Sequence, residues 1–254
     1  MSQINVAIQI VNYKTKIFLD PLISSIIKDT KSSNLNLEIN IIDNNSGDDI
    51  TDIAALRAHK NVHVYKSKIN GGFGAGHNIL ATKTKAEYLL ILNPDVLFIE
   101  VNTIINLVNK LKLTKASVIG PKLLTPIVRS TKPLETISLA GLKQQTYDHG
   151  KDYISPYKLN DVMSNVAWVS GAVFLIKHED FSKLQFDERF FLYYEELDLC
   201  LRLRREGKVI IYEPNIKVLH YGSVVAKKFS VTMLKSFIYF YYKRLINYLP
   251  IRYL

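Results

Sequence analysis

The sequence contains a single cysteine, Cys200, which excludes an internal disulfide and any zinc site built from paired cysteines. We therefore expect a reducing compartment. No stretch approaches the ~20 consecutive apolar residues that a membrane-spanning helix needs. The opening residues, MSQINVAIQIV, have no basic segment before their apolar run, which favours a buried first strand over a signal peptide. Together these absences predict a protein that is soluble or peripheral to a membrane.

Two common nucleotide-binding motifs are also absent. No P-loop pattern occurs, and the first expected strand is followed by VNYKTK rather than by a glycine-rich loop. The run NGGFGAGHN (70–78) fails as a dinucleotide fingerprint, because His77 stands where the last glycine belongs and the run follows the third strand. Dehydrogenase and P-loop functions are disfavoured. A sugar nucleotidyltransferase, which usually carries a glycine-rich basic loop directly after its first strand, is disfavoured for the same reason.

The charge is strongly basic, with 33 Lys and Arg against 23 Asp and Glu, a formal net charge of +10. Such a balance indicates an anionic partner: nucleic acid, acidic lipid or phosphate groups. No recognised nucleic-acid motif is present, so we expect no nucleic-acid partner. Residues 227–254 hold six basic residues and no acid.

Short apolar runs alternate with helical patterns in the first 95 residues, and this order predicts a mostly parallel, doubly wound α/β sheet. The expected strands are Ile4–Val11, Glu38–Ile42, Val62–Tyr65 and Tyr88–Leu92, and the expected helices cover 16–29, 49–59 and 75–84. Further on, helices are expected at 101–112 and 195–206, strands at 117–119, 166–176, 209–212 and 216–219, and irregular loops over 121–165.

Polar residues follow each of the first four strands. Asn12 and Tyr13 follow the first, the run 43–48 (DNNSGD) the second, the run 70–78 the third, and Asn93-Pro94-Asp95 the fourth. Each could be an ordinary turn. Because the carboxyl ends of parallel strands meet at one edge, where open sheets bind ligands, we expect these residues to line a site.

Three places in the sequence carry acidic or imidazole side chains that are candidates for catalysis or metal binding. Asp95, after a strand of core character, could hold a hard divalent cation, although a simple Pro-Asp turn is an alternative. His220 follows another strand-like run and could equally be structural. Glu195, Glu196 and Asp198 crowd the start of a helix, which the helix dipole alone would favour. The preceding aromatic residues, FFLYY, could partly desolvate a carboxylate and raise its pKa towards that of a working base.

These segments, taken in order, resemble family 2 glycosyltransferases of the GT-A fold, and bacterial rhamnosyltransferase-like enzymes of surface-polysaccharide assembly in particular. The resemblance covers about residues 4–245 and rests on the ordered set DNNSGDD, NGGFGAGHN, LLILNPDV, WVSGAVFLIKHEDF, FDERFFLYYEELDLCLRLRREG and HYGS. It implies a Rossmann-like sheet flanked by helices. A catalytic domain would span 1–226, with a nucleotide-binding half (1–95) and an acceptor-binding half (96–226), followed by a basic aromatic helix at 227–254.

The resemblance also implies residue roles. Asp43, Asn45, Asn12 and Tyr13 would line the base and ribose pocket of a UDP- or dTDP-linked sugar donor, with Gly74, Asn78 and Asn93 also against the donor. Asp95 and His220 would bind Mg²⁺ or Mn²⁺. Glu196 would be the general base, with Glu195 able to share the role, and Trp168, Ser170 and Gly171 would border the sugar or acceptor.

Two positions depart from the family pattern. Asn93 replaces the first acid of the Asp-x-Asp metal motif, which removes one negative charge beside the metal. Glu196 replaces the usual Asp and lengthens the base by one methylene. The implied activity is inverting, metal-dependent transfer to a lipid-linked or polysaccharide hydroxyl, by a peripheral protein at the cytoplasmic face of the cell membrane. The alternative from another class is a non-catalytic nucleotide-binding or membrane-scaffold protein of the same fold.

The C-terminal segment has its own pattern. Apolar residues recur at helical spacing in 229–249, at Leu234, Phe237, Ile238, Tyr241, Leu245 and Tyr248. A basic, aromatic-rich amphipathic helix is typical of an element that lies on an anionic membrane surface. The other interpretation is a helix packed on the catalytic domain, and the two are compatible if one face packs and the other meets lipid.

Overall fold

The computed structural model describes residues 3–53, 59–128, 132–133, 138–145, 148–150, 162–222 and 231–247. In this part of the chain a central mixed sheet has the strand order β3-β2-β1-β4-β11-β6-β12-β5. Its strands are β1 (Ile4–Asn12), β2 (Leu35–Asp43), β3 (Val62–Lys66), β4 (Tyr88–Leu92), β5 (Val96–Leu97), β6 (Val118–Pro126), β11 (Val173–Lys177) and β12 (Ile210–His220). Short strands β7 (Leu142–Gln144) and β9 (Ser164–Asn165) pair with β6 and β12, and β8 (His149–Gly150) pairs with β10 (Trp168–Val169).

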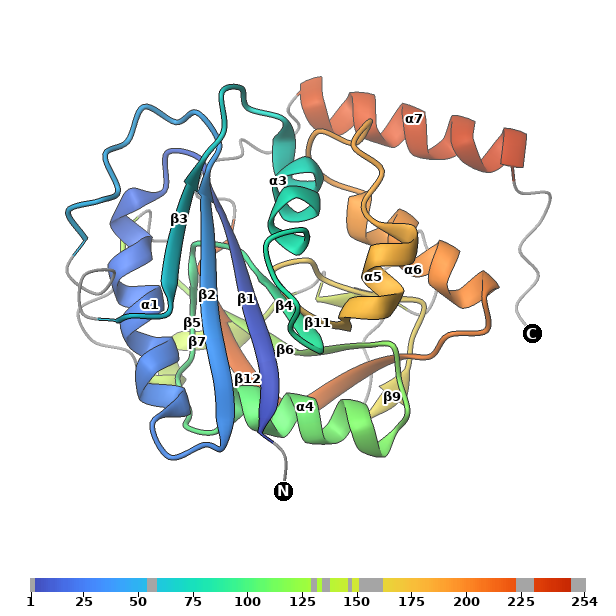
Figure 1. Cartoon of the computed structure of the whole chain (residues 1–254). Coiled ribbons are helices and arrows are strands. Elements are labelled where there is room, and N and C mark those ends of the chain that lie inside the picture. Colours follow the sequence, from blue (N-terminus) through green and yellow to red (C-terminus); the bar gives the residue numbers. More distant parts are fainter. Residues whose placement is uncertain are drawn as a thin grey trace.

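The predicted fold class is confirmed: β1 to β4 form a parallel half, built by the expected β-α-β order. Beyond β4, strand β11 runs antiparallel to both β4 and β6, while β12 is parallel to β6. The carboxyl ends of β1, β2, β3 and β4 therefore lie at one edge, at the top of Figure 1.

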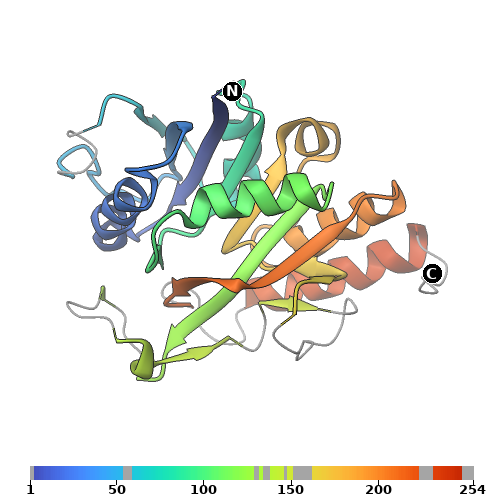
Figure 2. The same cartoon turned by 90° about the horizontal axis from the view of Figure 1, so that it is seen from below.

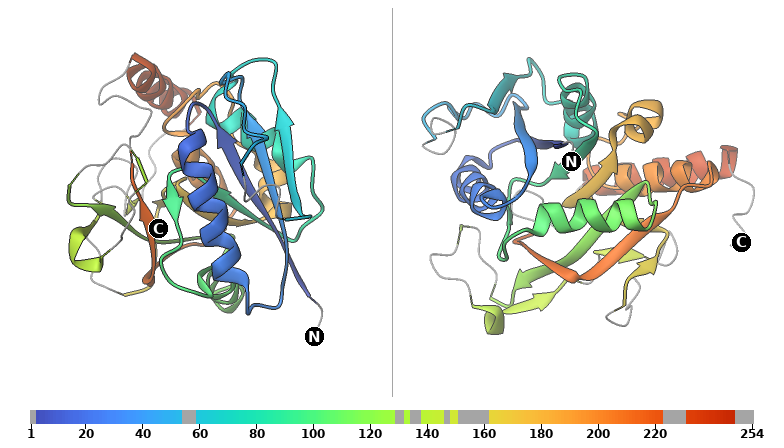
Figure 3. Two further views of the ribbon diagram at one scale, coloured as in Figure 1. Left: turned by 90° about the vertical axis from the view of Figure 1, so that its left-hand side faces the viewer. Right: turned by 60° about the horizontal axis from the view of Figure 1, so that its bottom comes forward.

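Helices cover both faces of the sheet. On one face, α1 (Lys16–Thr30) and α4 (Thr103–Leu113) bury their apolar stripes in a core with the aliphatic residues of β1, β2 and β4 (Figures 1 and 3). Seen from below, α4 lies across β6 and β12 (Figure 2). On the other face lie α3 (Gly72–Ala81), α5 (His178–Leu184) and α6 (Glu195–Arg205), in a second core rich in phenylalanine.

One expected strand is broken. Residues 166–176 do not form a single strand: β10 ends at Val169, β11 begins at Val173, and the two belong to different sheets. The Ser170-Gly171-Ala172 turn between them follows from the small, polar Ser-Gly pair in an otherwise apolar run. This break matters because the turn contacts both halves of the candidate site.

Other boundaries also differ from expectation. Helix α3 begins at Gly72, so the glycine-rich run forms the start of the helix rather than a turn before it. Residues 49–53 contain no helix, and the remainder of the helix expected at 49–59 falls largely on 54–58, outside the described residues. The two strands expected at 209–212 and 216–219 are one strand, β12, with an irregularity between Glu213 and Lys217. The loops expected at 121–165 contain the end of β6 and β7 to β9, while 151–161 lie outside the described residues.

The C-terminal helix α7 (Val231–Asn247) packs against the second core through Phe240, Tyr239 and Tyr241. It lies at the top of Figure 1, at the end of the molecule towards which β1 points, whereas α4 lies at the bottom. The division of the chain at residues 95 and 226 stays a prediction. None of the described helices combines the length and the apolar content required to cross a bilayer.

Candidate active site

Asp95 and His220 are brought together from segments 125 residues apart, as the sequence predicted. Strand β12 ends at His220, which pairs with Val96 of the short β5, and this places its imidazole beside Asp95. The His220 Nε2 atom lies 3.4 Å from Asp95 Oδ1. The Gly222 amide donates to Asp95 Oδ2 at 3.0 Å, and the Tyr221 amide donates to the Asp95 carbonyl at 3.0 Å. Both side chains are buried, so the pair is held rigidly.

Gln145 fixes the orientation of the His220 imidazole. The Gln145 Nε2 donates to the His220 carbonyl at 2.9 Å, which leaves Gln145 Oε1 facing His220 Nδ1 at 3.1 Å. Because an amide oxygen can only accept, Nδ1 carries the proton of the neutral ring, and Nε2 keeps its lone pair. Asn93 Nδ2 lies 3.2 Å from that nitrogen and donates to it. The ring is thus set with an acceptor nitrogen beside Asp95. No sequence motif pointed to Gln145.

Glu196 lies in the first turn of α6, and its carboxylate accepts a hydrogen bond from the Gly171 amide. Its neighbour Glu195 is buried, and Glu195 Oε2 has no hydrogen-bond partner among the described residues. Glu196 is only half-buried. Of the two, Glu196 therefore has both a fixed orientation and an open side from which to exchange a proton.

Burial sets the acid–base properties of this pair. It raises the pKa of the Glu196 carboxyl above its usual value, and hydrogen bonds from backbone amides only partly oppose this. Burial, followed by the charge of Glu196, raises the pKa of Glu195 still further. Two adjacent carboxyls with separated pKa values suit a proton-accepting role for Glu196, since Glu195 holds its proton to higher pH.

The broken strand connects the two groups of residues. The backbone N–H of Gly171 contacts Glu196. The carbonyl of the next residue, Ala172, accepts a hydrogen bond from the backbone N–H of Asn93 at 3.0 Å. Asn93 in turn reaches His220. A chain of contacts therefore runs from the carboxylate of α6, through the 170–172 turn, to the Asp95–His220 pair.

At the ends of β1 and β2, Asn12 and Asp43 are buried and bonded to each other, with Asn12 Nδ2 donating to Asp43 Oδ1 at 2.7 Å. The Ser46 hydroxyl also donates to Asp43, and Thr15 Oγ1 donates to Asn12 Oδ1 at 2.8 Å. These contacts fix the loop at the sheet edge. Asn45 is exposed there in a left-handed conformation (φ 59°), and Tyr13 is half-buried beside Lys14, whose Nζ lies 5.4 Å from the ring centroid.

Asn44 is a residue of this edge that the sequence did not single out. It is buried, and its Nδ2 donates to Asn70 Oδ1 at 3.0 Å and to the Gly72 carbonyl at 2.9 Å, which ties the loop after β2 to the start of α3. Its place in the run Asp43-Asn44-Asn45 was the available signal. Both residues lie beyond the end of β2, and Asn44 is buried whereas Asn45, with its left-handed backbone, is exposed.

Gly74 and Asn78 both contact Phe186, in the segment before α6. A Cβ on Gly74 would lie 2.8 Å from Phe186 Cβ. Asn78 exchanges two hydrogen bonds with the backbone of Phe186, each at 3.0 Å, and donates to Glu188 at 3.0 Å. These contacts position the segment that leads to α6. A role for either residue in donor binding stays a prediction.

The residues expected at the acceptor side lie around the 170–172 turn. Trp168 is buried in β10 opposite Gly150, the Ser170 amide donates to the Asp148 carbonyl at 2.9 Å, and Gly171 contacts Glu196. The structure brings this turn and β10 next to α6.

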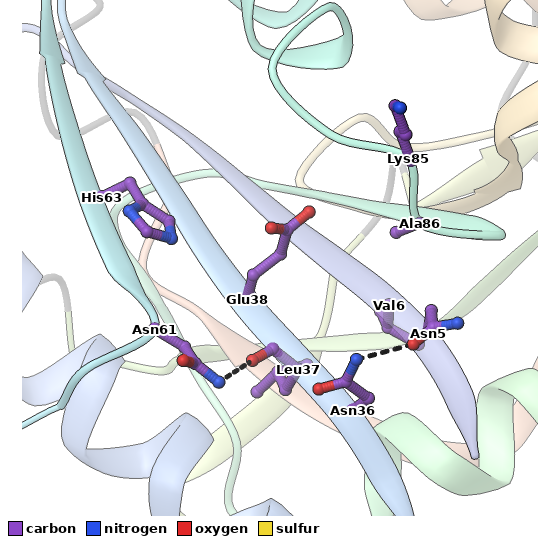
Figure 4. Close-up of a pocket in the computed structure, with 9 residues that line it drawn as sticks. All are labelled: Asn5, Val6, Asn36, Leu37, Glu38, Asn61, His63, Lys85 and Ala86. Atoms are coloured by element: carbon purple, nitrogen blue, oxygen red, sulfur yellow. Dashed lines mark hydrogen bonds between the residues drawn. The ribbon is translucent and has the colours of Figure 1, made fainter.

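A hollow elsewhere on the molecule belongs to the opposite edge of the sheet. Figure 4 shows its lining, which includes Asn5, Glu38, His63 and Lys85, at the starts of β1, β2 and β3 and just before β4. Asn36 donates to Asn5 Oδ1, and Asn61 donates to the Leu37 carbonyl (Figure 4). None of the predicted site residues lines this hollow.

Comparison with known families matches residues 7–170, more than half of the chain, to the model of glycosyl transferase family 2. The chain belongs to this family. Within it, 200 residues are 26% identical to the rhamnosyltransferase WbbL of Escherichia coli K12, an alignment that covers 69% of this chain and 72% of that protein. An N-acetylglucosaminyl-diphospho-decaprenol L-rhamnosyltransferase of Mycobacterium tuberculosis is 23% identical over 201 residues, 71% of this chain and 66% of that one. The predicted resemblance to rhamnosyltransferases is confirmed.

The similarity extends to a hexosyltransferase and to solved structures. Agl10, a low-salt glycan biosynthesis hexosyltransferase of Haloferax volcanii, is 28% identical over 213 residues, 80% of this chain and 62% of that one. The crystal structure of GalNAc-T7 with UDP, GalNAc and Mn²⁺ matches with a TM-score of 0.67 and 16% identity, over 93% of this chain and 47% of that one. A Pyrobaculum calidifontis mannosyltransferase in complex with GDP-mannose and Mn²⁺ matches with a TM-score of 0.63 and 14% identity, over 85% and 56%. These structures establish the GT-A fold for the family 2 domain, and this chain spans about half the length of each.

The residues of this family 2 site fit a divalent cation. Within the described segments, no three His, Cys, Asp or Glu residues gather into a group that could enclose a metal. Asp95 Oδ1 and His220 Nε2, 3.4 Å apart, nevertheless offer two adjacent ligands. Mg²⁺ is commonly held by only one or two protein ligands together with substrate phosphates, so this incomplete set matches a cation that arrives with a diphosphate.

Proposed function

We propose that this family 2 enzyme is an inverting glycosyltransferase that moves a sugar from dTDP-rhamnose or a UDP-hexose to a hydroxyl of a lipid-linked or polysaccharide acceptor. The observation that carries the proposal is the chain of contacts from Glu196, through the 170–172 turn and Asn93, to His220 and Asp95. It holds a proton-accepting carboxylate and a pair of cation ligands in a fixed relation at one edge of the sheet.

Glu196 takes the proton from the acceptor hydroxyl, which attacks the anomeric carbon from the face opposite the diphosphate and inverts its configuration. The Gly171 amide orients the carboxylate for this step, and burial keeps its pKa raised, so that it accepts a proton readily. Asp95 and His220 would hold Mg²⁺ or Mn²⁺, and the ion would supply positive charge to offset the negative charge of the leaving diphosphate. Glu195 is buried and keeps its proton to higher pH than Glu196 does. Its side chain lies beside Glu196 but does not reach the acceptor.

The donor lies along the carboxyl ends of β1, β2 and β4. Asp43, held by Asn12, contacts the base, Tyr13 and Asn45 border the base and ribose, and Asn93 lies near the diphosphate beside the cation ligands. Trp168, Ser170 and Gly171 border the transferred sugar and the acceptor. Support for this division comes from the two Mn²⁺-containing neighbours, one solved with UDP and GalNAc and the other with GDP-mannose.

The acceptor is lipid-linked or a polysaccharide, and the protein works in the cytoplasm at the inner face of the cell membrane, in assembly of a surface glycan. The support is the mycobacterial relative, named for an acceptor carried on diphospho-decaprenol, together with the basic C-terminal segment of this chain. The anionic membrane surface is then a partner as well as the site of the substrate.

The test is release of nucleoside diphosphate by the purified protein from a panel of UDP-, dTDP- and GDP-sugars, with Mg²⁺, Mn²⁺ or a chelator. We expect release from one donor class only, lost with the chelator and lost in Asp95→Asn and His220→Ala. Lys68→Ala, an exposed change near the donor edge, is the control and should retain activity. Donor binding without any turnover, in every donor and metal, would identify a non-catalytic nucleotide-binding protein instead. Release of pyrophosphate from a nucleoside triphosphate and a sugar phosphate would identify a nucleotidyltransferase.

A further inference from the structure

Helix α7 has two faces of opposite character, and their arrangement is the reverse of the usual one. The side chains turned towards the domain include polar and charged ones: Ser236 and Lys243 are buried together with Phe240. Apart from Lys235, the exposed side chains described on α7 are aliphatic or aromatic. We define the outer face of α7 as its exposed apolar residues Val231, Leu234, Phe237, Ile238, Tyr242, Leu245 and Ile246, whose exposed fractions run from 42% to 81%.

The inner face of α7, which includes Ser236, Tyr239 and Lys243, forms hydrogen bonds and ion pairs with the rest of the molecule. Rotation of α7 to bury the outer face would break these contacts. Lys243 Nζ lies 2.7 Å from an Asp187 carboxylate oxygen and 2.6 Å from Asp198. Ser236 Oγ donates to the Leu192 carbonyl at 2.8 Å, and the Tyr239 hydroxyl donates to Asp187 at 2.9 Å. A helix anchored by two buried ion pairs has a defined register, and the exposure of its outer face follows from that register.

The outer face forms a continuous stripe. Its members recur at intervals of three and four residues from Val231 to Leu245, the spacing that places side chains along one side of a helix. A contiguous apolar stripe of this length on a solvent-facing helix marks an interaction surface. Of the apolar positions expected from the sequence, Leu234, Phe237, Ile238 and Leu245 belong to the stripe and Tyr241 is partly packed against the core. The remaining one, Tyr248, lies outside the described residues.

The charge of the C-terminal segment indicates which kind of partner the outer face of α7 binds. No Asp or Glu follows Glu213 in the sequence, whereas the sequence segment 227–254, which contains the stripe, also contains Lys227, Lys228, Lys235, Arg244 and Arg252. Lys235 is exposed on α7 itself. Aliphatic side chains in a segment that carries basic and no acidic residues match the interface of an anionic bilayer, where the aliphatic groups enter the acyl region and the basic groups meet the headgroups.

We propose that the outer face of α7 is the surface by which this protein docks on an anionic lipid bilayer, with Leu234, Ile238 and Leu245 entering the acyl boundary. This deepens the proposed function by naming the surface that brings a lipid-linked acceptor to the site. The inner face contacts the segment that leads into Glu196, for Tyr194 packs on Phe240 with ring centroids 5.2 Å apart. The docked helix is thereby in direct contact with the base-bearing element.

The first test is flotation of the purified full-length chain with vesicles of phosphatidylcholine, with and without phosphatidylglycerol. We expect binding to the vesicles that contain phosphatidylglycerol, weakened by salt. The combined change Leu234→Ser, Ile238→Ser and Leu245→Ser should reduce it at least ~10-fold, because it removes the apolar part of the interaction. Leu113→Ser, an equally exposed leucine at the end of α4, on the opposite side of the molecule, is the matched control and should bind as the unchanged protein does (Figure 1). Equal thermal unfolding midpoints show that each variant is folded.

A second measurement locates the contact directly. Leu234→Trp should be quenched by vesicles that carry brominated acyl chains, and Leu113→Trp should not. Vesicle binding that survives the triple change, or equal quenching of the two tryptophans, overturns the proposal. So does a dimer in solution that the triple change dissociates, since a second copy would then cover the stripe. Binding requires no donor or metal, so failure here is distinct from failure to transfer sugar.

Discussion

Gln145 and His220 are joined by two hydrogen bonds that run in opposite directions, one from the Gln145 amide to the His220 carbonyl and one from His220 Nδ1 to the Gln145 amide oxygen. The pair of bonds admits only one orientation of the amide and one neutral tautomer of the ring. It is this arrangement that presents the lone pair of Nε2 to the side on which Asp95 lies.

Replacing Gln145 should therefore weaken cation binding without removing a ligand. We expect Gln145→Leu to lower Mn²⁺ affinity about 10–100-fold, as loss of an outer partner of a metal-bound histidine does elsewhere. Gln144→Leu is the matched control, because Gln144 bonds to Asp148 and Tyr212 rather than to His220. Titration of Mn²⁺ by electron paramagnetic resonance in the presence of nucleoside diphosphate gives the affinities. Nitrogen-15 spectra of the imidazole give the tautomer, and a wild-type ring protonated on Nε2 would refute the assignment.

Gly72 should be far less replaceable than Gly47, although both have positive φ, 89° and 81°. A Cβ on Gly72 would lie 2.2 Å from the Phe191 carbonyl oxygen, whereas a Cβ on Gly47 meets nothing within 4 Å. Gly47→Ala should lower the free energy of unfolding by about 1–2 kcal/mol, the penalty of the left-handed conformation alone. Gly72→Ala should lower it by more than ~4 kcal/mol, because a backbone carbonyl must move. Urea denaturation of both variants measures the difference, and equal losses would mean that α3 and the segment before α6 are not in close contact.

How much of this could be predicted from the sequence differs between the two halves of the site. The placement of Asn12, Asp43 and Asp95 along one edge followed from the alternation of strands and helices, because parallel strands bring their carboxyl ends together. His220 was found only through the resemblance and its position after a strand. What brings it to Asp95 is a pairing between β12 and β5 that no local pattern specifies.

The remaining features depend on tertiary contacts. The break at Ser170-Gly171 was hidden inside an apolar run, and Gln145 lies in a polar stretch without periodicity. In α7 the apolar pattern was visible in the sequence, but the face that packs on the rest of the molecule was not. Lys243 is buried because it forms ion pairs with Asp187 and Asp198, which belong to two other segments. The periodicity of a helix shows how apolar one face is. It does not show whether charged residues elsewhere in the chain form ion pairs with the opposite face and so bury it.

Glu195→Gln should stabilise the protein at neutral pH. Burial raises the pKa of Glu195 above its unfolded value of about 4.5, so the unfolded chain ionises first, and stability falls as pH rises from that value towards the folded pKa. The amide removes this loss. The unfolding midpoint of the variant should exceed that of the unchanged protein at pH 7, and the gap should close near pH 4. A variant that is less stable at pH 7 would show that the Glu195 carboxylate has a partner that stabilises its ionised form.

The pH dependence of transfer should report Glu196. Because burial raises the pKa of its carboxyl, kcat/KM should fall on the acid side at a pH above the ordinary value for glutamate. Activity is lost as pH decreases through that raised pKa, since the base becomes protonated. In Glu195→Gln this acid limb should stay at the same pH, because Glu195 keeps its proton to higher pH than Glu196 and carries no charge while Glu196 titrates. A limb that moves to lower pH in this variant would show that Glu195 is ionised beside Glu196.

The most direct test of the account compares Glu196→Gln with the unchanged protein in two assays, sugar transfer and donor binding in the presence of Mn²⁺. Glutamine retains the size of the side chain and an oxygen that can accept the Gly171 hydrogen bond, but it cannot take a proton. The account predicts a fall in transfer of about 10²–10⁴-fold with an unchanged dissociation constant for the donor. Full turnover by Glu196→Gln would contradict it.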